Sequence, residues 1–183
     1  MMGMSLESMA IEMPAVFGHP NRVAFRGVLT TVDAASDKAP AGARGHRVML
    51  TRAAAEEAIP SLLGMGLDYS PRLDGHDTRR KIGVITRAEI VGREIGVGGF
   101  LYGRDFPEMV EEIGKTMAPQ RSGADGEVRA GEVELGMSYE ITDAVVEDNK
   151  AQIWVLKHVT FTGAAVLRRD KAAYRTTWIE LVR

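Results

Sequence analysis

The feature that most limits the fold of this chain is an apolar stretch at 81–103 that a Gly-Arg pair divides into two halves. The stretch, KIGVITRAEIVGREIGVGGFLYG, is rich in isoleucine and valine, which favour strands. Gly92-Arg93 lies midway and is typical of a tight turn. The stretch therefore predicts a β-hairpin, and the chain must contain a sheet.

Other segments with the composition of strands lie on both sides of this hairpin, at 22–32, 46–51, 132–144, 151–163 and 174–182. Helical patterns cover 51–64, with Thr51 as a candidate N-cap, and 105–118, with Asp105 as a candidate cap. The small and polar stretches 33–45 and 119–131 predict loops, and 167–174 predicts a short helical or turn connection. The sum predicts an α+β fold with a mostly antiparallel sheet and two or three helices.

Composition narrows the class of protein. A length of 183 residues predicts one domain, at 22–183, behind a methionine-rich arm at 1–21 that lacks the basic start of a signal peptide. The absence of cysteine excludes disulfides, thiolate metal sites and a cysteine nucleophile. A net charge of −2 gives no basic field for direct nucleic-acid binding. No apolar run reaches the roughly 18 residues that a membrane helix needs.

A charged turn holds the most unusual local chemistry. In LDYSPRLDGHDTRRKIG, His76 lies between acidic residues and the basic run 79–81. Ser138 lies in LGMSYEI and His158 in WVLKHVTF, both on predicted strands. Taken singly, each has an ordinary interpretation as a turn, strand or core residue. A metal site of His46, His76 and Asp77 lacks zinc-like spacing, so we expect no metal and no cofactor.

The joint order is more informative. The chain has Gly75-His76-Asp77, then Gly136-Met137-Ser138, then KHVTFTGAAVL, and then the pair Arg168-Arg169. This order resembles the assemblin proteases of herpesviruses and the prohead maturation proteases of tailed phages, over roughly residues 22–175. The resemblance implies a barrel-like, assemblin-like protease fold. It also implies a phage head maturation serine protease that cleaves scaffold and capsid precursors inside the prohead.

The resemblance implies a role for each residue. Ser138 would be the nucleophile and His76 its general base, because a serine hydroxyl needs a neighbouring base to take its proton. His158 would orient His76, and Arg168 and Arg169 would support the oxyanion. The implied partners are phage major capsid and scaffold proteins and further copies of this chain. The implied location is the host cytoplasm during assembly, and then the prohead or the virion capsid.

One residue departs from the family pattern and keeps an alternative open. Strand alternation places Glu140 on the same face as Ser138, where its carboxylate would repel an oxyanion or pair with Arg168 or Arg169. The alternative is a non-catalytic capsid decoration or scaffold protein on the same fold, attached through the arm and the loop at 119–131. A small-ligand-binding β-barrel has no specific support in the sequence.

Overall fold

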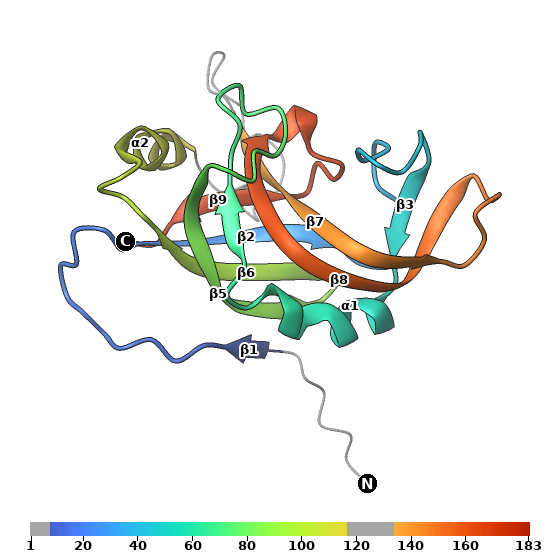
Figure 1. Ribbon diagram of the computed structural model, residues 1–183, viewed down its shortest axis with the longest axis horizontal. Helices are drawn as coiled ribbons and strands as arrows, with labels where there is room; N and C mark the ends of the chain where they lie inside the picture. The colour runs from blue at the N-terminus through green and yellow to red at the C-terminus, as the bar shows by residue number, and fades with distance from the viewer. Residues whose placement is uncertain (1–7, 117–133) are drawn as a thin grey trace, which may run out of the picture.

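The fold is α+β, with one curled, mixed sheet and two α-helices (Figure 1). The computed structural model describes residues 8–116 and 134–183. The strands are β1 (Ser8–Ala10), β2 (Val23–Thr31), β3 (Arg47–Leu50), β4 (Gly66–Asp68), β5 (Lys81–Val91), β6 (Glu94–Leu101), β7 (Leu135–Val146), β8 (Ile153–Arg168) and β9 (Trp178–Leu181). The helices are α1 (Arg52–Ala58) and α2 (Pro107–Lys115), with 3₁₀ turns η1 (Ile59–Leu62) and η2 (Arg169–Lys171).

The strands form one sheet in the order β3-β8-β4-β5-β6-β2-β9, and β1 and β7 add to β5 and β8 respectively. The prediction of a mostly antiparallel sheet is confirmed only in part, because β8 runs parallel to both β3 and β4. The other described pairings are antiparallel. Strand β8 is long enough to pair with β3 at one end, with β4 at the other, and with β7 on its second edge.

The predicted hairpin at 81–103 is present as β5 and β6. Gly92 turns the chain with a φ of 61°, a conformation that favours glycine. The glycines of β6 let the sheet curl, since a Cβ at Gly99 would overlap the carbonyl oxygen of Val84. Strands β4 and β1 were not predicted, because each has only three residues.

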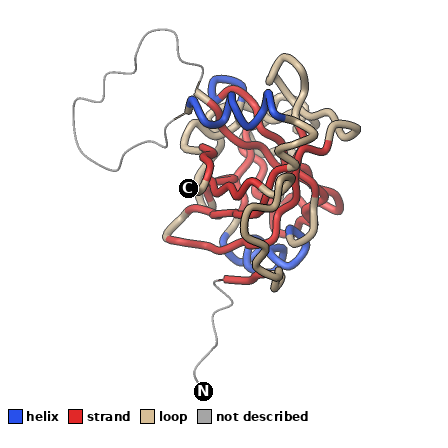
Figure 2. The backbone as a smooth tube through the Cα atoms, turned by 90° about the vertical axis from the view of Figure 1, so that its left-hand side faces the viewer, coloured by secondary structure: helices blue, strands red, loops and turns tan. Residues whose placement is uncertain are grey.

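The helices lie on opposite sides of the sheet body (Figures 1 and 2). Thr51 caps α1 as predicted, with its side chain accepting a hydrogen bond from the Ala54 N–H. Pro60 then lies in the 3₁₀ turn that follows. Asp105 does not cap α2: Phe106 holds the N-cap position and makes no side-chain cap.

The core lies inside the curl of the sheet. Its largest fully buried side chains come from β2 to β6, from β8, and from η1 and α2, and include Phe25, Leu29, Leu62, Ile85, Leu101 and Phe161. Burying each such side chain contributes about 1.5–3 kcal/mol to folding. The predicted loop at 119–131 lies outside the described residues. None of the described helices is long and apolar enough to cross a membrane.

Candidate functional site

Ser138 lies on β7 with its side chain on the face opposite the core. Its neighbours point inward, since Met137 is 1% exposed and the ring of Tyr139 packs edge-on against Phe161 at 5.5 Å between centroids. Alternation along the strand therefore turns Ser138 to the outer face. Across the antiparallel pairing, Ser138 lies opposite Ala165 of β8.

His76 comes from the loop between β4 and β5, and the register of β8 explains how it reaches Ser138. Ala165 pairs with Ser138 on one side and with Asp68, the last residue of β4, on the other. Residues directly opposite one another share a face of the sheet. The loop that follows Asp68 thus crosses over a small alanine, and the Nε2 atom of His76 lies 3.1 Å from the Oγ atom of Ser138. That distance is within hydrogen-bond reach.

The charges of the turn hold the loop in this position. Asp68 is fully buried and accepts hydrogen bonds from the backbone N–H of Asp77, at 3.1 Å, and from Nζ of Lys81, at 3.0 Å. The carboxylate of Asp77 in turn accepts the backbone N–H of Arg79 and contacts the Arg80 guanidinium. The hydrogen bond from the Arg79 backbone and the two guanidinium groups lower the pKa of Asp77. The loop is therefore ordered by its own ion pairs.

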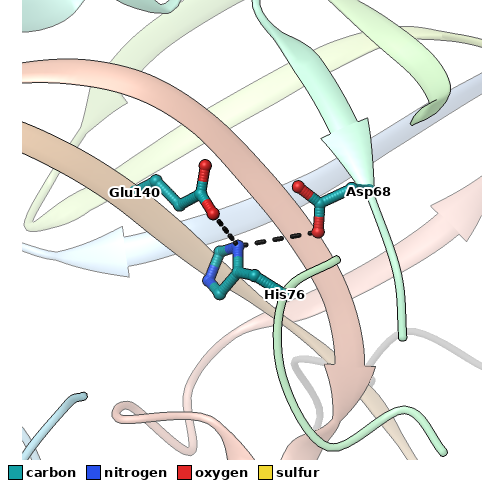
Figure 3. Close-up of side chains that lie close together, drawn as sticks. All are labelled: Asp68, His76 and Glu140. Carbon is teal, nitrogen blue, oxygen red and sulfur yellow. Dashed lines mark ion pairs between the residues drawn. The ribbon is translucent and has the colours of Figure 1, made fainter. Parts of the chain in front are cut away.

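Two carboxylates lie behind His76 (Figure 3). Oε1 of Glu140 is 3.2 Å from Nδ1 of His76, and Oδ1 of Asp68 is 3.6 Å from the same atom. Glu140 has room there because it lies opposite Gly163, where a Cβ would come within 3.0 Å of its carboxylate. A serine, a histidine and acidic groups behind the histidine form the arrangement used in acyl transfer.

The environment keeps Asp68 ionised. Burial raises the pKa of Asp68, but the polar contacts and positive charge of His76 and Lys81 outweigh it and hold that pKa below its ordinary value. A carboxylate with a lowered pKa in the folded state stabilises the fold above its unfolded pKa, and this contribution disappears as the pH falls through the folded pKa.

We therefore expect acid to remove the stabilising effect of Asp68. The difference in unfolding free energy between the wild type and Asp68→Asn should persist from neutral pH down to about pH 5, because the unfolded pKa is about 3.9. It should shrink below about pH 4. Denaturant melts of both proteins across this range measure the difference. An undiminished difference at the lowest pH at which both proteins fold would contradict the assignment.

The structure does not bring His158 to this site. His158 lies opposite Val145 on the β7–β8 hairpin, and its Nδ1 is 3.5 Å from Oε1 of Glu57 in α1. It precedes Ala165 on the same strand by seven positions, which is about 23 Å of extended chain at roughly 3.3 Å per residue. The orienting position predicted for His158 is instead taken by Glu140 and Asp68.

Arg168 and Arg169 are likewise occupied elsewhere. The backbone N–H of Arg168 donates to the carbonyl of Leu73, and that of Arg169 donates to the carbonyl of Glu134, both at 2.7 Å. Their side chains bind Asp170 and Glu134 respectively. Neither backbone donor is free to bind an oxyanion, as the oxyanion-support prediction required. Glu140 pairs with His76 and not with these arginines, which corrects the expectation for its charge.

The sequence interpretation missed the acidic partners. Alternation did place Glu140 on the face of Ser138, but gave no sign that a loop histidine would lie there. Asp68 ends a three-residue strand, and its pairing with β8 depends on a register that no local pattern encodes.

No protein-family model matches this chain, and no curated protein matches it.

Proposed function

We propose that this chain is a serine endopeptidase in which Ser138 is the nucleophile and His76 is the general base. The observation that carries the proposal is the 3.1 Å contact between Oγ of Ser138 and Nε2 of His76, with two carboxylates at the opposite nitrogen. Sequence order alone suggested this pair. The three-dimensional contact between residues 62 positions apart supports it independently.

The chemistry follows from these positions. Oγ of Ser138 attacks the scissile carbonyl as Nε2 of His76 takes the hydroxyl proton. The imidazolium that forms is stabilised at Nδ1 by Glu140 and Asp68. His76 then gives the proton to the leaving amine, and a water molecule, activated by the same nitrogen, hydrolyses the acyl-enzyme and regenerates Ser138.

The two carboxylates differ in distance from Nδ1 and in burial, and we assign them different roles. Glu140 is the closer to Nδ1 and is partly exposed, so we assign it the stabilisation of the imidazolium. Asp68 is fully buried and also binds the backbone of the His76 loop, so we assign it the positioning of that loop. Lys81 neutralises part of the negative charge that two carboxylates would otherwise concentrate there.

The more specific proposal is a head maturation protease of a tailed phage, which cleaves scaffold and capsid precursors inside the prohead. The resemblance in residue order supports it, together with a site built on a curled sheet and not on the strand-to-helix elbow of α/β-hydrolases. Homo-oligomerisation and location in the prohead belong to the same proposal.

The test is covalent labelling of Ser138 followed by precursor digestion. A fluorophosphonate should label the wild type at Ser138 and should not label Ser138→Ala, while the exposed control Ser8→Ala should label normally. Co-assembly of the wild type with the phage's scaffold and capsid precursors should produce defined fragments that Ser138→Ala does not produce. Absence of labelling in folded wild-type protein would refute the enzyme proposal.

A second candidate is a non-catalytic capsid component on the same fold. The observation that favours it is the engagement of the Arg168 and Arg169 backbone donors, because acyl transfer requires fixed donors for the oxyanion. In that case the protein should approach capsid stoichiometry in mature virions and should leave the precursors intact. A protease should be scarce there or degraded.

A further inference from the structure

The two carboxylates and the imidazole behind Ser138 are also side chains of the kind that bind metal ions. We propose that Asp68, His76 and Glu140 form a Zn²⁺ site, and that zinc bound there switches the hydrolase off. The metal site stands on geometry alone, whereas its inhibitory effect rests on the proposed function. The donor atoms come from β4, from the loop after it and from β7, and all lie within 4.8 Å of one another.

The two separations from Nδ1 of His76 match those of a tetrahedral zinc site. Zinc binds histidine nitrogen and carboxylate oxygen at about 2.0–2.2 Å, so two neighbouring donors of a tetrahedron lie roughly 3.3–3.5 Å apart. Nδ1 of His76 lies 3.2 Å from Oε1 of Glu140 and 3.6 Å from Oδ1 of Asp68. These separations bracket that value, and three protein donors leave a fourth position for water, as in many zinc sites.

Nδ1 of His76 is the independent sign that this space suits a ligand. The atom is buried and has no hydrogen-bond partner among the described residues, although two carboxylate oxygens lie nearby. Oδ1 of Asp68, at 3.6 Å, is too far away for a hydrogen bond, and Oε1 of Glu140, at 3.2 Å, makes none with the ring nitrogen. The three donor atoms therefore lie close together, and a buried polar atom without a partner is costly unless something binds it.

The donor set and its surroundings select the ion. One imidazole with two carboxylates suits Zn²⁺ better than Mg²⁺ or Ca²⁺, which prefer oxygen ligands alone. Asp68 is pre-positioned, since it is fully buried and held by the Asp77 N–H. The positive charge of Lys81, 3.0 Å from Asp68, opposes a cation and makes this a reversible site of modest affinity.

Zinc at Nδ1 would block the base. A neutral imidazole carries one proton, and a metal on the Nδ1 lone pair leaves that proton on Nε2. Nε2 then donates to Oγ of Ser138, 3.1 Å away, and has no lone pair with which to accept the hydroxyl proton. Zinc would also withdraw the two carboxylates from stabilising an imidazolium. Both effects remove the activation of Ser138.

The experiment measures binding and reactivity separately on the full chain. Calorimetry with ZnCl₂ should give one site in the wild type and in Ser138→Ala, which keeps all three ligands. Glu140→Gln should weaken binding at least tenfold, whereas Glu57→Gln, which alters the exposed partner of His158, should bind as the wild type does. Circular dichroism melts confirm that each variant is folded. Equal zinc affinity in Glu140→Gln and wild type would overturn the site.

The reactivity of Ser138 tests whether bound zinc inhibits the hydrolase. Fluorophosphonate labelling of wild-type Ser138 should fall at least tenfold at saturating zinc and return on addition of EDTA. Labelling that zinc leaves unchanged or increases would overturn the inhibitory role. If zinc binds in a Glu140-dependent manner but the metal-free protein never labels, the metal site is supported and the proposed hydrolase function fails.

Discussion

Replacing His76 with alanine should reduce kcat/KM of precursor cleavage by roughly 10⁴- to 10⁶-fold, because the Ser138 hydroxyl then has no base. Ser138→Ala should lose a similar factor. The double variant should be no worse than either single one, since the two residues act as a unit. Rates on a peptide that spans a mapped precursor cleavage site provide the measurement.

The matched control is His158→Ala. His158 is half-buried and bound to Glu57, at the other end of the β7–β8 pairing, so its loss should leave kcat/KM within about twofold of the wild type. A large loss in His158→Ala, alongside the loss in His76→Ala, would restore the histidine-based orientation that the sequence predicted. The two histidines thus separate the arrangement expected from residue order from the one in the structure.

Asp68→Ala should have the largest effect on stability among the site variants, about 1–3 kcal/mol of unfolding free energy. The reason is that it removes a fully buried carboxylate and leaves the Lys81 ammonium and the Asp77 N–H without their acceptor. Denaturant melts measure the loss. Fluorophosphonate labelling should fall as well, since the loop that carries His76 loses its anchor.

The control for this prediction is Asp74→Ala on the same loop. Asp74 is exposed. Its carboxylate accepts a hydrogen bond from the Ser70 hydroxyl, and its backbone N–H donates to the same oxygen, so the loss of its side chain should cost less than about 1 kcal/mol. Similar losses in Asp68→Ala and Asp74→Ala would mean that the buried carboxylate does not anchor the loop.

The extent to which sequence predicted this molecule depends on the range of each interaction. The hairpin at β5 and β6 and the Thr51 cap follow from residues close in the chain, and both were predicted correctly. The parallel pairing of β4 with β8 joins segments almost a hundred positions apart, and no local pattern encodes it. The site follows the same division. Ser138 and His76 were identified by order, but their acidic partners depend on that distant pairing.

The position of Ala165 between β4 and β7 has a consequence for when the site can exist. Among the described residues β8 follows the other long strands in the chain, and until it inserts between β4 and β7 the pairing that sets the loop of His76 beside Ser138 cannot form. In a nascent chain that lacks β8, Ser138 and His76 would therefore not be in contact. Under the proposed function, cleavage would therefore begin only after the carboxy-terminal third has folded.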